Sequence, residues 1–311
     1  MGGFVMAIAL VAASGTMGTA QAATLPVRPF EGFPAAGVVP LTHGHSHNDY
    51  QRRHPLSDAL SRGFTSVEVD VVLVSGQLLV GHDLVQALVR GATLRSLYLD
   101  PLADWVARNG GAVFPRGGPP LTLLVDVKSE ARSTWRALEA VLAGYADMFT
   151  RVTSDGVHPG AVTVVVSGNR APGLVAEHSD RFTALDGRAD DLARAHPAEA
   201  ALMPMVSERW GDLFRWSGSG EMPAAERAAM RALVETAHAQ GRRVRFYDTP
   251  DRTAAARENV WRAELAAGVD LLNVDDLASG QAFLLEQQRG QERAPARTGV
   301  PPIRERAPRA R

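Results

Sequence analysis

The sequence predicts an α/β fold of the (β/α)8, or TIM, barrel class. Eight candidate strands alternate with candidate helices along a chain of 311 residues, 45% of them hydrophobic. Roughly 250 residues are typical of such a barrel, so the length suits one barrel with short extensions. No Gly-rich dinucleotide-binding turn follows the first candidate strand, which disfavours an open doubly wound sheet. We therefore expect a single catalytic domain from residue 26 to residue 286.

The expected strands are short segments that are either apolar throughout or alternate apolar and polar residues. In chain order they are 38–42, 66–72, 121–127, 161–167, 183–186, 201–206, 243–247 and 271–274. Three segments between them carry helix signals. The segments 55–63 and 223–241 begin with proline and end with glycine, and apolar residues recur at helical spacing in 135–145.

Charge and cysteine content exclude several classes of function. The formal net charge is -1, which gives no general electrostatic reason to bind nucleic acid or an anionic membrane. The chain has no cysteine, so disulfides and thiolate chemistry are excluded. Lys128 is the only lysine among 33 basic residues, all the others being arginine. This single lysine is therefore a position of interest.

Both ends of the chain differ in composition from its middle. Residues 1–23 contain an apolar run and then Ala20-Gln21-Ala22, which resembles a secretory signal peptide, although no basic residue precedes the run. We expect a secreted or cell-envelope protein, the alternative being a disordered or lipid-associated leader. Residues 287–311 are rich in Arg, Pro, Gly and Gln, which predicts a disordered basic tail that is solvated or, less favourably, binds anionic surfaces.

The second expected strand carries two carboxylates on one face. Val67, Val69 and Val71 alternate with Glu68 and Asp70, which is the period of a strand. Like charges a few ångströms apart raise each other's pKa, so the pair is costly unless a cation lies between the two groups. Oxygen ligands suit Ca2+ or Mg2+. The alternative is a solvated edge strand without a metal.

Further polar groups follow the other early strands. His47 and Asn48 come after the first strand, His82 ends the excursion after the second, and Asp126 and Lys128 share one face of the third. Catalytic groups of a barrel gather at the carboxyl ends of its strands, so all seven polar groups are expected to meet at one mouth. The alternatives are ordinary core histidines and a buried Asp126–Lys128 ion pair.

These motifs resemble a known superfamily. The segments Ser46–Tyr50, Glu68-x-Asp70, Gly81-His82-Asp83 and Asp126-x-Lys128 are similar to those of the phosphoinositide phospholipase C and glycerophosphodiester phosphodiesterase enzymes. Within it they most resemble the branch named after altered inheritance of mitochondria protein 6. The resemblance extends more weakly to segments 245–250 and 273–276.

The resemblance implies a metal-dependent phosphoric diester hydrolase with one divalent cation, Ca2+ or Mg2+. It implies a phosphodiester small molecule or a lipid head group as substrate, with transient contact at a membrane surface and no nucleic acid partner. By the same resemblance, the residues have these roles: His47 and His82 catalytic; Asn48, Glu68, Asp70 and Asp126 metal ligands; Lys128 bound to the substrate phosphate. We expect His82 to be the general acid and His47 the base or a phosphate ligand. The chain lacks the His-Arg-Gly and Glu-Asn-Thr motifs of glycerophosphodiester enzymes, which disfavours glycerophosphodiesters as substrates.

Two other readings remain open. His43-x-His45 also suits a histidine-ligated metal hydrolase of the amidohydrolase type, but such a site needs further histidines on later strands. His178, His196 and His238 fall in helical or loop contexts instead. A barrel that binds ligands without catalysis is the second alternative. His45 itself is expected to be a core residue rather than a ligand.

Overall fold

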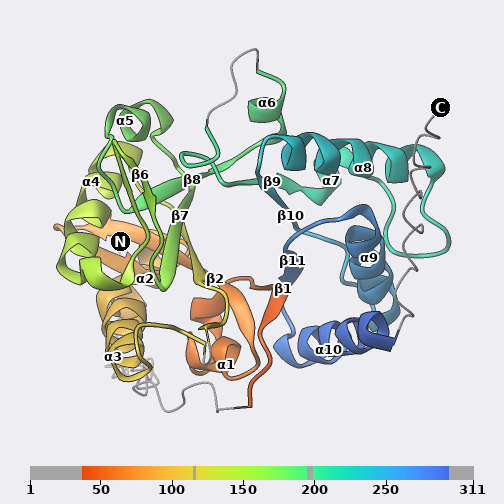
Figure 1. Ribbon diagram of the computed structural model, residues 1–311, viewed down its shortest axis with the longest axis horizontal. Helices are drawn as coiled ribbons and strands as arrows, with labels where there is room; N and C mark the ends of the chain where they lie inside the picture. Colours follow the sequence, from red (N-terminus) through yellow and green to blue (C-terminus); the bar gives the residue numbers. More distant parts are fainter. Residues whose placement is uncertain (1–36, 115–116, 195–198, 294–311) are drawn as a thin grey trace, which may run out of the picture.

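Eight parallel strands curl into a nearly closed barrel, with helices around its outside (Figure 1). The computed structural model describes residues 37–114, 117–194 and 199–293. The strand order is β10-β9-β8-β7-β4-β2-β1-β11, and a parallel bridge between Arg245 and Leu271 brings the last strand next to β10. The expected (β/α)8 barrel is therefore confirmed.

The barrel strands alternate with helices along the chain. The strands of the barrel are β1 (Leu41–Ser46), β2 (Phe64–Val74), β4 (Leu121–Val127), β7 (Val162–Gly168), β8 (Thr183–Gly187), β9 (Met205–Arg209), β10 (Arg243–Tyr247) and β11 (Leu272–Val274). The helices are α1 (Ser57–Leu60), α2 (Leu84–Arg90), α3 (Asp100–Arg108), α4 (Ala131–Leu142), α5 (Pro172–Glu177), α6 (Ala189–Leu192), α7 (Trp210–Leu213), α8 (Ala224–Ala239), α9 (Ala254–Ala267) and α10 (Leu277–Arg293). The three helix signals in the sequence correspond to α1, α4 and α8.

Two strands lie later in the chain than their apolar residues indicated. The first was expected at 38–42 and β1 runs over Leu41–Ser46; the sixth was expected at 201–206 and β9 runs over Met205–Arg209. Each apolar segment contains a proline, Pro40 or Pro204, that cannot donate to a sheet ladder. The strands continue instead through polar residues that face the interior of the barrel. Because these interior positions are polar, the apolar pattern did not predict the bounds of either strand.

Two hairpins were not expected. β3 (Gln77–Val80) pairs antiparallel with the end of β2 through a turn at Ser75 and Gly76, both at positive φ. A smaller hairpin joins β5 (Arg151–Thr153) to β6 (Gly156–His158). The β2–β3 hairpin matters for the site, because β3 leads directly into Gly81 and His82.

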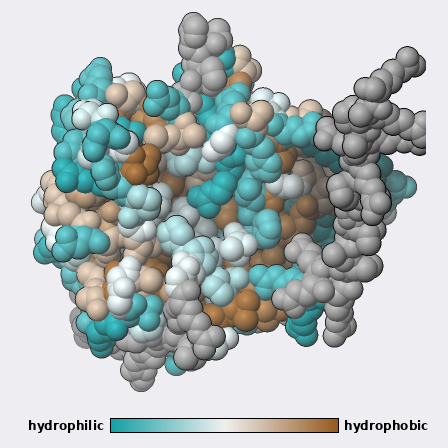
Figure 2. All heavy atoms as spheres, viewed as in Figure 1, coloured by the Kyte–Doolittle hydropathy of each residue, from teal (hydrophilic) through white to brown (hydrophobic). Residues whose placement is uncertain are grey.

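An apolar layer closes the inside of the barrel beneath its polar mouth. Leu124, Val165, Met205 and Leu271 form one buried cluster from four strands. On β4 the inward-facing positions continue from Leu124 to Asp126, so the barrel interior changes from apolar to charged within one step along the strand. Figure 2 shows the molecule from the same side as Figure 1, with hydrophilic residues across the middle of that face.

The ends of the chain are described only in part. Residues 1–23, the expected signal peptide, and residues 294–311 of the expected tail lie outside the described residues. The expected domain boundary at residue 286 falls inside α10, which continues to Arg293. Residues 287–293, which composition assigned to the tail, are therefore helical.

A buried glutamate in α9 gives a prediction about stability. Glu264 is fully buried, and neither of its carboxylate oxygens accepts a hydrogen bond from a described residue. Burial raises the pKa of this carboxyl well above its usual range, so it is protonated in the folded state. The stability it contributes is fully present below the pKa of the unfolded chain and is lost as pH rises through the folded pKa.

Glu264→Met is therefore expected to raise the unfolding free energy by about 1–3 kcal/mol, because it removes a polar group that is buried without a partner. Glu264→Gln should melt above the parent protein at pH 8, and the difference should shrink as the pH is lowered toward 5. Thermal melts across this range measure both effects. The exposed Glu258 on the same helix is the control, since Glu258→Met should change stability by about 0.5 kcal/mol or less. A destabilised Glu264→Met protein would contradict the prediction.

Candidate active site

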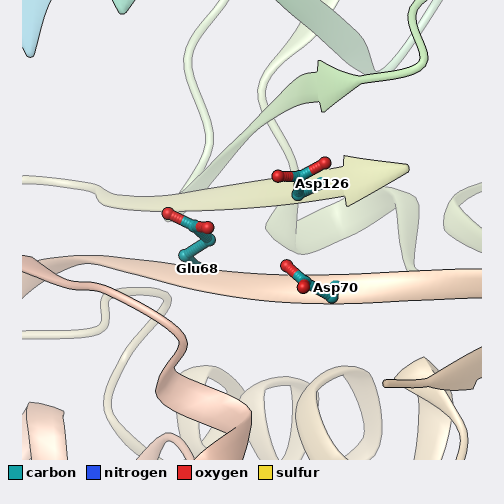
Figure 3. A group of neighbouring side chains, drawn as sticks. All are labelled: Glu68, Asp70 and Asp126. Carbon is teal, nitrogen blue, oxygen red and sulfur yellow. The ribbon is translucent and has the colours of Figure 1, made fainter. Parts of the chain in front are cut away.

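Three carboxylates meet at the mouth of the barrel. Glu68 and Asp70 come from β2 and Asp126 from β4, and the strand register places Asp70 beside Asp126. One oxygen of each lies within 4.8 Å of the others. Figure 3 shows Glu68 and Asp70 on one strand and Asp126 on the next, with the three side chains close together. Asp126 of β4 thus joins the two carboxylates of β2.

The arrangement of these carboxylates fits a hard divalent cation. Asp70 Oδ1 and Asp126 Oδ1 are buried and have no hydrogen-bond partner among the described residues. Burial, together with the nearby charges of Asp70 and Glu68, raises the pKa of Asp126 to about 6, against the opposing charge of Lys128. Gly168 passes so close that a Cβ there would lie 2.0 Å from Asp126 Oδ1. Two free oxygens in a crowded acidic site are what a cation with oxygen ligands would satisfy.

Two buried residues hold one carboxylate oxygen of Glu68. Arg245 Nη1 donates to Glu68 Oε2 at 2.6 Å, and His45 Nε2 lies 3.0 Å from the same oxygen. Although burial opposes it, the Arg245 charge and the His45 hydrogen bond hold the pKa of Glu68 well below its usual range. Burial and Arg245 lower the pKa of His45 to about 4, so this histidine is neutral. His45 also bonds Ser66 Oγ at 2.7 Å, which makes it a core residue that positions Glu68.

His47 forms a dyad with an aspartate that follows the neighbouring strand β11. Its Nδ1 lies 2.8 Å from Asp275 Oδ1, just after β11, and its Nε2 is 3.9 Å from Glu68 Oε1. Burial opposes charging of the ring, but the Asp275 hydrogen bond and the Glu68 charge raise the pKa of His47 overall. Asn48 Nδ2 lies 3.1 Å from His47 Nε2. The second nitrogen of His47 therefore faces the carboxylates.

His82 forms a second dyad. Its Nδ1 lies 2.8 Å from Asp70 Oδ2, and Tyr50 donates its hydroxyl to the same oxygen at 3.0 Å. The His82 side chain is 59% exposed, in contrast to the fully buried Asp70. Since Asp70 accepts from Nδ1, the Nε2 atom of His82 is left for the open side of the site. Both expected catalytic histidines are thus oriented by a carboxylate at Nδ1.

The loop that carries His47 and Asn48 is fixed by its own buried network. Asp49 accepts hydrogen bonds from Ser46 Oγ at 2.9 Å, Leu56 N at 2.6 Å and Tyr98 Oη at 2.8 Å. Asn48 has φ 48°, a left-handed conformation that asparagine tolerates better than most residues. The loop is therefore held in one shape by side chains that sequence reasoning did not assign.

Lys128 lies beside Asp126 and Asp70. Its Nζ is 2.9 Å from Asp126 Oδ2 and 3.5 Å from Asp70 Oδ2. The Asp126 and Asp70 charges raise the pKa of Lys128 against the effect of burial, so it is a cation. A cavity of about 560 Å3 opens beside it, and six of the seven expected site residues line the cavity: His47, Asn48, Glu68, His82, Asp126 and Lys128. The seventh, Asp70, lies buried beneath them.

Helix α2 carries an exposed apolar face next to His82. Leu84, Val85, Leu88 and Val89, here called the α2 apolar face, are each between 51% and 69% exposed. Ala87 packs inward on the other side of the helix and is fully buried. Among the described residues, none of the helices is long and apolar enough to cross a membrane.

Several residues of the site were not assigned from the sequence. Arg245, Asp275, Tyr50 and Ser66 hold the predicted residues in place, and Arg188 lines the same cavity. The alternation of Arg243, Arg245 and Tyr247 within an apolar strand could have indicated that charged side chains point into the barrel. The contacts of Asp275 with His47 and of Arg245 with Glu68 join residues too far apart in the chain for any local signal.

The histidines needed for the amidohydrolase reading lie elsewhere. His178 Nδ1 lies 2.8 Å from the Leu174 carbonyl, and His238 Nε2 lies 2.9 Å from Asp270 Oδ2, whereas His196 lies outside the described residues. His43 Nδ1 lies 2.9 Å from the Asp270 carbonyl. In the ranges that the structure describes, no histidine from a later strand joins His45 and His47.

Comparison with known proteins identifies a family and several relatives. Residues 34–186 match the family model described as an AIM6-like phosphodiesterase domain, a range that contains all seven expected site residues. The altered inheritance of mitochondria protein 6 of Eremothecium gossypii is 30% identical over 274 residues, covering 79% of this chain and 70% of that protein. The homolog in Arthroderma benhamiae is 29% identical over 273 residues, covering 79% and 85%.

Solved structures are more distant. A glycerophosphoryl diester phosphodiesterase from Parabacteroides distasonis aligns over 81% of this chain and 87% of that chain, with 15% identity and a TM-score of 0.46. A dihydropteroate synthase from Xanthomonas albilineans aligns over 81% and 95%, with 15% identity and a TM-score of 0.40.

The comparisons correct one expectation and identify the family. The expected secreted or cell-envelope localisation is wrong, because the relatives are named for altered inheritance of mitochondria, a mitochondrial association rather than secretion. On the sequence similarity to these relatives and on its phosphodiesterase domain, this chain belongs to the altered inheritance of mitochondria protein 6 family.

Proposed function

We propose that this chain is a metal-dependent phosphoric diester hydrolase that uses His47 and His82 as its acid–base pair. The observation that carries the proposal is the cluster of Glu68, Asp70 and Asp126, in which two buried oxygens have no hydrogen-bond partner among the described residues. Lys128 lies beside this cluster, and so do His47 and His82, each oriented by a carboxylate. Asn48, Glu68, Asp70 and Asp126 would hold one divalent cation, Ca2+ or Mg2+. When bound, such an ion offsets negative charge on the phosphodiester oxygens and lowers the pKa of a neighbouring hydroxyl.

The two histidines are suited to move protons at opposite sides of the phosphate. Asp275 and Asp70 each accept from Nδ1, which fixes the tautomer and leaves Nε2 as the atom for proton transfer. In His47 this atom also lies 3.1 Å from Asn48 Nδ2. His82 is the proposed general acid, donating from Nε2 to the leaving alkoxide. His47 is the proposed base, taking a proton at Nε2 from the attacking hydroxyl.

The cations of the site bind and orient the substrate. Lys128 lines the open cavity, so its ammonium is the group that reaches a phosphate oxygen beside Asp126. Arg245 is only 5% exposed and is already bonded to Glu68, Ser207 and Asn273. We infer that Lys128 contacts the phosphate, whereas Arg245 keeps Glu68 ionised and in place.

Removal of divalent ions is expected to abolish hydrolysis of a 4-nitrophenyl phosphodiester. Ca2+ or Mg2+ should restore it, and Asp70→Asn should weaken the binding of the restoring ion, because each carboxylate is a hard anionic ligand. Calorimetric titration of the metal supplies a readout that does not depend on turnover. Glu258→Gln, on the outer helix α9, is the matched control. Undiminished turnover in excess chelator would exclude metal dependence, and absence of turnover with every metal would favour the non-catalytic barrel.

We further propose that the α2 apolar face meets a phospholipid surface and brings membrane-borne phosphodiesters to the site. The face begins two residues after His82 and turns its large apolar side chains outward, as an interfacial helix does. Val85→Ser with Leu88→Ser should lower binding to phosphatidylcholine vesicles, measured by co-sedimentation, and should lower hydrolysis of vesicle-borne substrate about tenfold. Hydrolysis of a dissolved 4-nitrophenyl phosphodiester should change less than twofold. Equal loss with both substrates would contradict a surface role, and a shift from dimer to monomer would indicate self-association instead.

A further inference from the structure

Another cation lines the cavity of the proposed site, two strands away from the β4 carboxylate of the metal cluster. Arg188 follows β8, lines the same cavity as Lys128, and is 28% exposed. Its Nη1 donates to Asp186 Oδ2 at 3.0 Å and to the Gly187 carbonyl at 2.7 Å. Asp186 is fully buried and also accepts from Ser167 Oγ at 2.8 Å. The guanidinium is therefore held in a fixed place at the cavity wall.

Other arginines lie close to Arg188 on this wall. Three arginines share two carboxylates: Arg188 pairs with Asp186 at 3.0 Å, and Arg170 and Arg194 pair with Asp191 at 3.7 Å and 2.9 Å. Burial and then the charge of Arg188 lower the pKa of Arg170, so the two guanidiniums repel each other. A bound anion would offset this repulsion.

The strand register places Arg188 near, but not at, the phosphate that Lys128 would hold. Asp126 on β4 is the register partner of Ser167 on β7, and Ser167 bonds Asp186 on β8. Two inter-strand spacings, or about 10 Å, therefore lie between the metal cluster and the strand that carries Arg188. The Arg188 guanidinium itself reaches back toward β7, where its Nη2 lies 3.5 Å from Ser167 Oγ, so it stands one strand away from Asp126. An anion held there would be a group close to the scissile phosphate in the substrate.

We propose that Arg188 binds a second anionic group, a carboxylate or a phosphate, on the alcohol portion of the phosphodiester substrate. This inference rests on the proposed function of the site and names the substrate class. The planar fork of arginine, already anchored on Asp186, suits a carboxylate or phosphate oxygen pair. Lys128, as a compact point charge, remains with the scissile phosphate.

Four probes of similar length test the proposal. All are 4-nitrophenyl phosphodiesters, and the second ester group is butyl, 4-hydroxybutyl, 3-carboxypropyl or 3-phosphonooxypropyl. The wild-type protein is expected to hydrolyse the two charged probes with kcat/KM about tenfold above the butyl probe, because a charge-assisted hydrogen bond is added. Equal values for all four probes, or an equal gain for 4-hydroxybutyl, would overturn a site for a second anion.

Variants test whether Arg188 causes the preference for the charged probes. Arg188→Gln should reduce the ratio of charged to butyl probe to near one, and Arg188→Lys should retain part of it. Arg194→Gln, in the same arginine cluster but outside the cavity lining, should keep the full ratio. If Arg188→Gln folds poorly because it leaves Asp186 unpaired, the double variant Asp186→Asn, Arg188→Gln removes both charges and is expected to lose the ratio as well. A ratio that survives in the double variant would exclude Arg188.

Failure of the proposed function would be seen separately. If none of the probes is hydrolysed with Ca2+ or Mg2+, calorimetric binding of the same probes decides the inference. Tighter binding of the charged probes that depends on Arg188 would support the anion site without catalysis. Binding that does not distinguish them would overturn it.

Discussion

Replacement of His82 by alanine is expected to lower kcat by about 10²- to 10⁴-fold, with a smaller change in KM. The reason is that a positioned proton donor acts in the transition state and adds little to ground-state binding. His82→Ala leaves Asp70 with its Tyr50 hydrogen bond, so the fold should survive. Steady-state kinetics with a 4-nitrophenyl and an alkyl phosphodiester measure the effect, and the loss should be larger for alkyl, whose alkoxide is the poorer leaving group.

Related variants distinguish the roles of the histidines. His47→Ala should cost about 100-fold or more with both substrates, because a base is needed whatever the leaving group. Asp275→Asn should lower turnover less than His47→Ala, since it disturbs the Nδ1 hydrogen bond and not Nε2. Equal sensitivity of the two substrates to His82→Ala would contradict its role as the acid. A greater loss from His45→Ala than from either would place the catalytic histidine two residues earlier.

Apolar patterning allowed most barrel strands to be predicted, and polar lining explains the misplacements. The bounds of β4 and β10 match the expected ranges, because their outward-facing positions are apolar and the segments are short. β1 and β9 were displaced because polar residues lie within these strands, and His45 of β1 and Ser207 of β9 bond the buried Arg245 inside the barrel. In a barrel with a charged mouth, the apolar pattern of the strands is therefore weakest at the strand ends that carry the site.

The candidate site was predictable where its residues cluster in the first half of the chain. His47, Glu68, Asp70, His82, Asp126 and Lys128 were named from motifs and strand periodicity, and the barrel brings them to one cavity wall or its floor. The site residues from the later strands were not assigned a role from the sequence. Asp275, Arg245 and Arg188 reach the site only because β8, β10 and β11 complete the ring, and no local pattern expresses that closure.

Lys128 is the last residue whose replacement should have a large effect. Lys128→Met is expected to lower kcat/KM about 100-fold, corresponding to roughly 3 kcal/mol of transition-state stabilisation, through loss of a charge beside the reacting phosphate. The competing interpretation is that Lys128 only neutralises Asp126, which it contacts at 2.9 Å.

Lys128→Arg separates the two interpretations. An arginine would still pair with Asp126, so a purely structural role predicts normal turnover. The ammonium, however, lies within 3.5 Å of Asp70 Oδ2 as well, and the wider guanidinium fork does not fit the same space between two carboxylates. Impaired turnover with an unchanged melting temperature would therefore support a phosphate contact, with the distant surface variant Arg151→Lys as the control. Near-normal turnover in both Lys128→Met and Lys128→Arg would remove Lys128 from the site.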